Sequence, residues 1–106
     1  MRPLIKAERA SAIFLKTSVS CCAKPFTVDS NEILVCNVGG SFYAIADVCT
    51  HDGGPLDQGQ LDGYCAICPR HGATFDVRTG AATMPAVVPV ATYAVREANG
   101  ELYLEL

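Results

Sequence analysis

The most informative part of this sequence runs from Asp47 to Gly80 and reads DVCTHDGGPLDQGQLDGYCAICPRHGATFDVRTG. It contains three of the six cysteines, both histidines and six of the nine glycines of the 106-residue chain. Glycine-rich segments can bend sharply, and cysteine and histidine are the usual protein ligands of zinc and of some iron–sulfur clusters. Reactive side chains and tight backbone geometry are therefore concentrated in one place.

Two pairs of residues, each with one cysteine and one histidine, stand out within this stretch. Cys49-Thr50-His51 is separated by sixteen residues from Cys68-Pro69-Arg70-His71. Loops that contain glycine and proline flank both pairs, so the four side chains can converge on one site. Two thiolates and two imidazoles suit either tetrahedral zinc or a 2Fe-2S cluster with cysteine on one iron and histidine on the other.

The ligand types, their spacing and their flanking residues resemble the Rieske ferredoxin family. The flanks that carry the likeness are Asp52-Gly53-Gly54-Pro55-Leu56 and Gly72-Ala73-Thr74-Phe75-Asp76-Val77-Arg78-Thr79-Gly80, and the similarity extends from about residue 33 to residue 106. The resemblance implies an all-β fold of three small antiparallel sheets, with two loops forming a cluster-binding tip. It also implies that Met84-Pro85-Ala86 belongs to a loop that shields a third side of the cluster.

The same resemblance assigns a role to each of the four predicted ligands. Cys49 and Cys68 would hold the inner iron of one Rieske-type 2Fe-2S cluster, and His51 and His71 would hold the outer, solvent-facing iron. Neutral imidazoles leave such a cluster less negative than four thiolates do, so it accepts an electron more easily. Zinc bound by the same residues is the alternative for this site.

Short β-like segments bounded by turn formers recur along the chain. We expect strands at residues 13–15, 26–28, 32–37, 42–46, 73–77, 91–96 and 101–106. Hairpin turns are expected within Asn37–Ser41 and at Asn99-Gly100, because these residues accept positive φ. The length predicts a single domain, and the resemblance implies that residues 1–106 form one Rieske domain with a cluster-binding subdomain at about 47–78.

Composition excludes several classes of function. The net charge is −3, with 8 basic and 11 acidic residues and no basic cluster, which argues against nucleic-acid binding. No apolar run approaches the roughly 20 residues that a membrane span needs. Glu8 and Arg9 interrupt any apolar signal segment, so we expect a cytoplasmic protein whose cysteines are thiols rather than disulfides.

The remaining cysteines and several charged residues receive simpler interpretations. Cys36 is expected to be a small buried hydrophobic residue and Cys65 a non-ligand residue of the strand before the second loop, whereas Cys21 and Cys22 are expected to be free thiols. Turn chemistry is expected of Asp52, Asp57 and Asp62. Arg70 is expected to be exposed beside the cluster, where partner docking and solvation are equally reasonable roles.

Comparison with the family also suggests a low reduction potential. Respiratory Rieske proteins carry an extra cysteine in each loop and a bracing disulfide, whereas this chain has Gly54 and Arg70 at the matching positions. Ala73 and Phe75 replace a serine and a tyrosine whose hydroxyl groups stabilise the reduced cluster in those proteins. We therefore predict a potential near the bottom of the Rieske range, roughly −150 mV.

The function predicted from these features is electron transfer rather than catalysis. We expect a monomeric one-electron carrier, and the resemblance implies that it passes electrons, through transient contacts, from a flavin reductase to the oxygenase component of a dioxygenase system. One alternative is a small subunit or accessory module of a larger redox enzyme, such as a nitrite reductase. A second alternative is a zinc-stabilised interaction domain.

Overall fold

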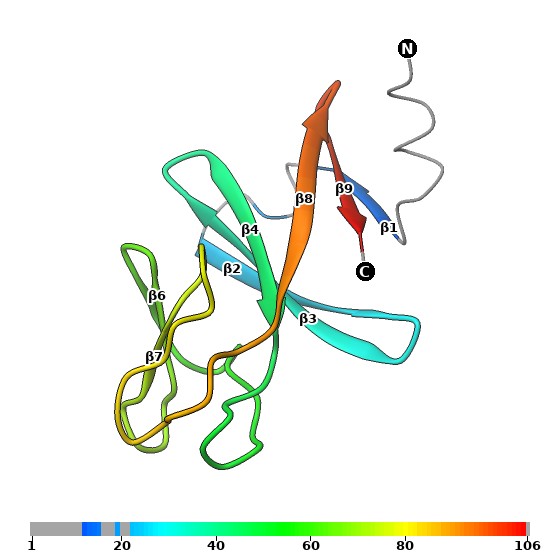
Figure 1. Cartoon of the computed structure of the whole chain (residues 1–106). Helices are drawn as coiled ribbons and strands as arrows, with labels where there is room; N and C mark the ends of the chain where they lie inside the picture. The colour runs from blue at the N-terminus through cyan, green and yellow to red at the C-terminus, as the bar shows by residue number, and fades with distance from the viewer. Residues whose placement is uncertain (1–11, 16–18, 20–21, 106) are drawn as a thin grey trace.

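The protein is built from β-strands, as the sequence predicts. The computed structural model describes residues 12–15, 19 and 22–105. No α-helix occurs among these residues, and Figure 1 shows the arrangement of the strands. Nine strands are formed by the described residues: β1 (Ala12–Leu15), β2 (Cys22–Val28), β3 (Asn31–Val38), β4 (Ser41–Ala46), β5 (Leu61–Asp62), β6 (Cys65–Ile67), β7 (Thr74–Asp76), β8 (Thr92–Ala98) and β9 (Glu101–Glu105).

The strands form two antiparallel sheets rather than the three expected from the sequence. The larger has the strand order β1-β9-β8-β4-β3-β2 and the smaller has the order β5-β6-β7. The larger sheet consists of two three-stranded groups that are joined where Ala44 and Ile45 of β4 pair with Tyr93 and Thr92 of β8. This short pairing between distant parts of the chain merges two of the predicted sheets into one.

Both predicted hairpin turns are confirmed. Gly39 and Gly40 have φ values of 60° and 94° between the paired residues Val38 and Ser41. Asn99 and Gly100 have φ values of 54° and 78° at the turn between β8 and β9. Positive φ at both central positions is the mark of a type I′ turn, whose twist matches that of the flanking strands.

A third hairpin turn of this kind was not predicted, because neither of its central residues is glycine. Asp29 and Ser30 adopt φ values of 51° and 68° between the paired residues Val28 and Asn31. We expect Ser30→Gly to raise the free energy of unfolding by about 0.5–1 kcal/mol, because glycine adopts this conformation without a Cβ clash. Urea denaturation of the two proteins measures the change, and a destabilised variant would contradict the prediction.

Strand β3 divides the core into two parts. Residues 33–36 are all buried, so this strand presents apolar side chains to both faces of the larger sheet. Ile33 and Val35 pack with Leu102 and Leu104 of β9. Leu34 and Cys36 pack with a second group that includes Phe75 and the two predicted cysteine ligands. The second core therefore extends up to the predicted metal site.

Cys36 behaves as expected from the sequence. It is fully buried, and burial raises the pKa of its thiol to about 12. Cys22 differs from the expectation of a free thiol, because it forms a disulfide. Cys21 and Leu106, which also carry predictions, lie outside the described residues.

Candidate metal centre

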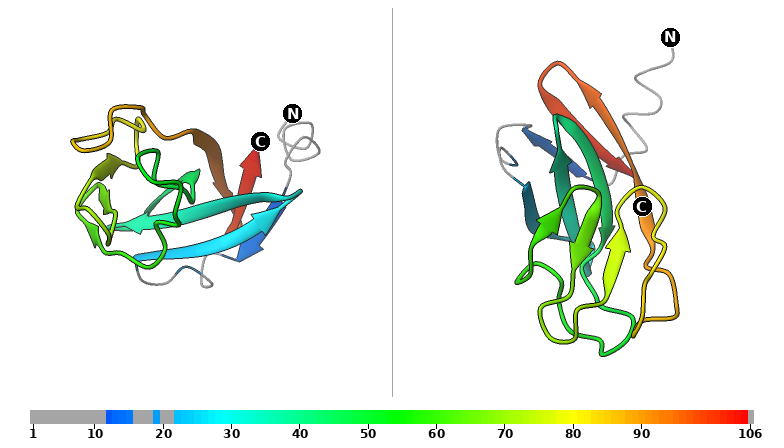
Figure 2. Two further views of the ribbon diagram at one scale, coloured as in Figure 1. Left: turned by 90° about the horizontal axis from the view of Figure 1, so that it is seen from below. Right: turned by 90° about the vertical axis from the view of Figure 1, so that its left-hand side faces the viewer.

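Three loops meet at one end of the molecule. Figures 1 and 2 show the loop after β4, the loop between β6 and β7, and the loop before β8 side by side, at the end opposite the β8–β9 turn. The first two contain the Cys-His pairs, and the third contains Met84–Ala86. Strand ends from both sheets therefore place these loops together, although they are distant in sequence.

The two loops with the Cys-His pairs share one backbone pattern. The N–H of Gly53 donates to the carbonyl of Cys49 at 2.7 Å, and the N–H of Cys49 donates to the carbonyl of Gly54 at 2.7 Å. In the second loop the N–H of Gly72 donates to the carbonyl of Cys68 at 3.1 Å, and the N–H of Cys68 donates to the carbonyl of Ala73 at 2.7 Å. Each cysteine is thus held at the base of a closed loop.

Glycine is required at one position in each of these loops. Gly53 and Gly72 each lie four residues after a cysteine, and their φ values are 78° and 81°. This left-handed conformation is costly for residues with a Cβ atom. The glycines that mark the loops in the sequence are therefore needed for the turns that bring the ligands together.

The structure brings all four predicted ligands to the same place. Cys49 and Cys68 are buried, at 0% and 1% exposure, while His51 and His71 are exposed. The two imidazole rings lie edge to face, with their centroids 5.0 Å apart. The two predicted inner ligands are thus buried and the two predicted outer ligands exposed, and their assignment to the two irons stays a prediction.

Backbone N–H groups around the two cysteines favour the thiolate form of each side chain. Burial raises the pKa of the Cys49 thiol, although the N–H groups of Asp52 and His51 act in the opposite direction. Burial also opposes ionisation of Cys68, but hydrogen bonds from the N–H groups of Arg70 and His71 contribute to a lowered pKa. Thiolate ligands of a metal centre are stabilised by such donors. The site is therefore suited to bind a metal through sulfur.

Asp52 lies between the two pairs of predicted ligands. One of its carboxylate oxygens is within 4.8 Å of the ligand atoms of Cys49 and Cys68, and the same holds for His51 and His71. Its Oδ1 accepts the N–H of Gly54 at 2.9 Å, so the predicted turn role of Asp52 is confirmed. Hydrogen bonds from the Arg70 guanidinium hold the pKa of the Asp52 carboxyl well below its usual range.

Asp47 fixes the base of the first loop, a role that the sequence analysis missed. It is 5% exposed, and its Oδ1 accepts the N–H groups of Leu56 at 2.7 Å and Asp57 at 2.9 Å. Burial raises the pKa of its carboxyl to about 6, with a further contribution from a hydrogen bond with the Asp57 side chain. An acidic residue directly after the apolar strand β4 was the only signal available in the sequence.

Hydroxyl groups attach the third loop to the other two. Thr50 donates from Oγ1 to the carbonyl of Val88 at 2.6 Å. The Thr83 hydroxyl accepts the N–H of Thr74 at 2.9 Å, and the two threonine hydroxyls are 2.8 Å apart. Ala86 of this loop is buried in the same core as Cys49 and Cys68. These contacts hold the third loop against the rest of the site, and the shielding role of Met84-Pro85-Ala86 stays a prediction.

The other residues with predicted roles belong to the smaller sheet or to the loop between β6 and β7. Ala73 and Phe75 are fully buried beside the predicted cysteine ligands. Cys65 is a free, half-buried cysteine of β6, opposite Asp76 of β7. Asp62 ends β5 and is exposed. Arg70 is not simply solvated, because it pairs with Asp52.

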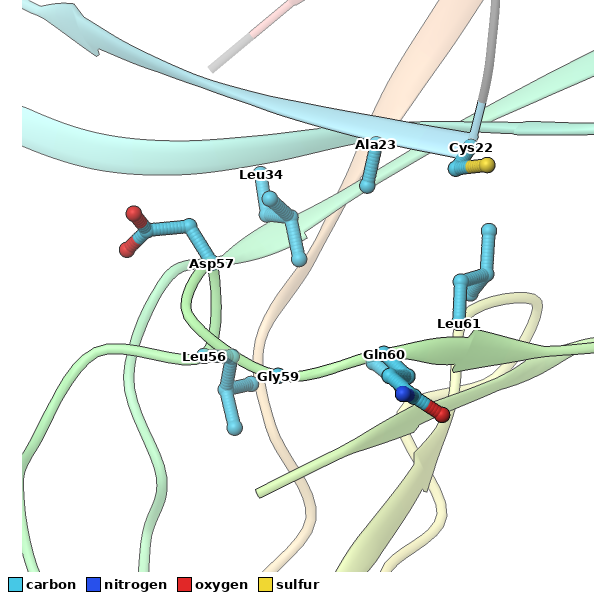
Figure 3. Close-up of a pocket in the computed structure, with 9 residues that line it drawn as sticks. Cys22, Ala23, Leu34, Leu56, Asp57, Gly59, Gln60 and Leu61 are labelled. Atoms are coloured by element: carbon cyan, nitrogen blue, oxygen red, sulfur yellow. The ribbon is translucent and has the colours of Figure 1, made fainter. Parts of the chain in front are cut away.

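A separate cavity lies between β2 and the segment after the first loop. Its volume is about 330 Å³, and Figure 3 shows Ala23, Leu34 and Leu61 among its lining side chains. None of the four predicted ligands lines it. The cavity is therefore distinct from the candidate metal centre.

Comparison with known proteins identifies the family. The model of the Rieske [2Fe-2S] domain matches residues 15–94 of this chain. The chain belongs to the Rieske [2Fe-2S] family. The ferredoxin component of biphenyl 2,3-dioxygenase from Rhodococcus jostii (strain RHA1) is 43% identical over 82 residues, which cover 76% of this chain and 77% of the relative.

Solved structures show the same fold in ferredoxins of dioxygenases. The ferredoxin of carbazole 1,9a-dioxygenase from Nocardioides aromaticivorans IC177 matches with a TM-score of 0.82 and 34% identity, covering 91% of this chain and 94% of that ferredoxin. A chain from a complex of reduced oxygenase and oxidized ferredoxin in carbazole 1,9a-dioxygenase matches with a TM-score of 0.79 and 33% identity, covering 86% and 96% of the two chains. This Rieske protein is thus a ferredoxin component, and its cofactor is a [2Fe-2S] cluster.

The donor set of this Rieske ferredoxin fits that cofactor. Two buried sulfurs and two exposed imidazoles at the end of two similar loops supply the mixed ligation that a Rieske cluster requires.

The described residues include no helix with the length and apolar character needed to cross a bilayer.

Proposed function

We propose that this ferredoxin carries single electrons from a flavin reductase to the oxygenase component of a ring-hydroxylating dioxygenase. Cys49 and Cys68 would bind the inner iron of the cluster, and His51 and His71 would bind the outer iron. The bound cluster supplies a site that stores and releases one electron. The observation that carries this proposal is the pair of exposed imidazoles above two buried thiols at one end of the molecule.

The residues around this end determine which side of the cluster would be exposed to solvent. Buried Ala86 and fully buried Phe75 keep water away from the inner, sulfur side. His51 and His71 face outward and give electrons a short route to a partner. With Ala73 and Phe75 in place of hydroxyl donors, we propose a potential near the low end of the Rieske range, roughly −150 mV.

Exposed apolar side chains of the third loop form a suitable docking face. Met84, Val87 and Val88 are 74%, 75% and 55% exposed, and they belong to the loop that is hydrogen-bonded to Thr50. Exposed apolar patches of this kind commonly mark protein contacts. We propose that oxygenase and reductase bind here in turn, through small contacts below about 1,200 Å².

The location and the domain organisation of the carrier also belong to this proposal. We propose that it is a cytoplasmic monomer and that residues 1–106 form a single Rieske domain with a cluster-binding subdomain at about 47–78. A carrier with one exposed redox face can transfer electrons without a stable complex with the reductase and without a larger assembly. The ligand types also suit a zinc-stabilised domain. Metal content and colour distinguish that alternative from a Rieske ferredoxin.

Purified protein is expected to be coloured and to contain two iron atoms per chain, since a Rieske cluster contains two irons. Its visible absorption should bleach on reduction with dithionite, and the reduced protein should give an electron paramagnetic resonance signal with an average g value below two. Anaerobically prepared protein that is colourless and contains zinc would overturn the proposed function.

The docking face gives a kinetic prediction. We expect Val87→Asp to slow reduction of an oxygenase by the reduced ferredoxin about tenfold, because a central interface residue contributes more than about 1 kcal/mol. The oxygenases of the biphenyl and carbazole systems are suitable partners. The rate is measured by stopped flow with the one that accepts electrons from the unmodified protein. The visible spectrum should remain unchanged, and any local effect of the added negative charge would lower the potential of the ferredoxin, which would not slow electron donation.

Thr27→Asp provides a matched control for this experiment. Thr27 is an exposed residue of β2, on the edge strand of the larger sheet, and its replacement makes the same change in net charge. The control should reduce the oxygenase at the original rate. Equal slowing by both variants would point to net charge instead of a docking face at Val87.

A further inference from the structure

We propose that Asp52, Gly54 and Arg70 form a clasp that joins the two ligand loops and helps them retain the cluster. Asp52 and Gly54 belong to the loop with the first Cys-His pair, and Arg70 belongs to the loop with the second. The inference rests on the proposed function, because it concerns the same four ligands. It assigns to these three residues a positioning role, in which they act through the four ligands.

The clasp is a two-point ion pair between the loops. Nε of Arg70 donates to Oδ2 of Asp52 at 2.6 Å, and the Nη2 group donates to Oδ1 at 3.2 Å. Their side chains are 33% and 19% exposed, so the pair is shielded on part of its surface. Two parallel charge-assisted hydrogen bonds fix relative orientation as well as distance.

Asp52 is also held by a backbone hydrogen bond within its own loop. The N–H of Gly54 donates to its Oδ1 at 2.9 Å, which closes a turn within the first loop. Oδ2 also lies 3.5 Å from Nδ1 of His71 in the second loop. The carboxylate therefore contacts backbone on its own side of the site and two side chains on the other.

Gly54 leaves the space that the guanidinium occupies. A Cβ atom at this position would lie 2.6 Å from Cζ, 2.7 Å from Nη2 and 2.8 Å from Nε of Arg70. Gly54 does not have the positive φ of Gly53, so its backbone does not itself require glycine. The absence of a side chain at Gly54 is thus explained by the position of Arg70.

The clasp acts directly on the two exposed ligands. Asp52 follows His51 in the chain, and Arg70 precedes His71. Joining Asp52 to Arg70 therefore limits how far the two imidazoles, whose centroids are 5.0 Å apart, can separate. Since a cluster is released when its ligands move apart, loss of the clasp should increase the rate of release.

The test compares cluster release from the unmodified ferredoxin with release from Asp52→Asn, Arg70→Gln and Gly54→Ala variants. The Asp52→Asn replacement keeps an acceptor for the Gly54 N–H while removing the charge, and Gly54→Ala displaces the guanidinium without altering either charge. Release is followed as bleaching of the visible absorption with a chelator in a fixed, subdenaturing urea concentration. Each variant should release the cluster about fivefold faster, as expected for a partly exposed ion pair.

Double variants test whether the three residues act as one unit. Combining Asp52→Asn or Gly54→Ala with Arg70→Gln should give the rate of the Arg70→Gln variant alone, because the interaction has already been lost. Arg70→Lys should restore only part of the retention, since lysine keeps the charge but not the two-point geometry. Rates that multiply in the double variants, or single variants that release the cluster at the original rate, would overturn the clasp.

Reduction potentials distinguish the clasp from a purely electrostatic role. A field effect alone would raise the potential in Asp52→Asn, lower it in Arg70→Gln and leave release unchanged, which would contradict the proposal. Failure of the proposed function has a different signature, because the unmodified protein would then contain no iron–sulfur cluster. Fast release from every variant of a coloured, redox-active protein supports both conclusions.

Discussion

Replacement of Cys68 by serine is expected to leave the purified protein colourless and unable to carry electrons. Cys68 is buried at the base of the second loop, where backbone N–H groups favour its thiolate. Serine has a much less acidic hydroxyl and cannot supply a soft sulfur ligand, so iron should be lost. Iron content and visible absorption should both fall to background, a change larger than that expected from any other single replacement considered for this protein.

Cys65→Ser is the matched control for this replacement. Cys65 lies three residues earlier in the same segment, but it is a free and half-buried residue of β6. The control should keep its iron and its spectrum. A colourless Cys65→Ser variant, or a Cys68→Ser variant with a full complement of iron, would show that the ligand set has been assigned wrongly.

The second large effect concerns the reduction potential. Replacement of His51 by cysteine is expected to lower the potential from roughly −150 mV toward the value of about −400 mV that is typical of all-cysteine ferredoxins. A third thiolate adds negative charge at the cluster, and charge opposes the uptake of an electron. Protein-film voltammetry measures the shift, and electron paramagnetic resonance should show the average g value rise toward that of all-cysteine clusters.

The exposed position of His51 makes this replacement feasible in the folded protein. Its side chain lies at the surface of the cluster end, so the core formed by Leu34, Phe75 and Val77 is untouched. Cys65→Ser serves again as a control and should leave the potential unchanged. An unchanged potential in a His51→Cys variant with two irons would exclude the imidazole at this position as a ligand.

Local patterns made part of this protein predictable. Gly39-Gly40 and Asn99-Gly100 mark hairpin turns because their backbone readily adopts positive φ, and both turns occur. Asp29-Ser30 forms the same kind of turn without glycine, and it was missed because the strands on either side impose the conformation. Turn prediction therefore succeeds where a residue's own preference is strong and fails where the neighbouring strands overrule it.

The candidate ligands were also evident from spacing, because their chemistry is concentrated in two short motifs. Cys49, His51, Cys68 and His71 do lie together at one end of the fold. Asp47 was not recognised, because its role is to accept the N–H groups of Leu56 and Asp57 from a later part of the chain. The disulfide of Cys22 was likewise not expected.

The sequence alone determined the all-β character, two of the hairpin turns and the residues from which a Rieske centre can be built. These features depend on the preferences of individual residues or on short spacings. Merging of the sheets through β4 and β8, attachment of the third loop by Thr50, and the pairing of Asp52 with Arg70 across Gly54 came only with the folded chain. Each of them depends on the approach of residues that are distant in sequence, and that approach is set by the packing of the two sheets around the two parts of the core.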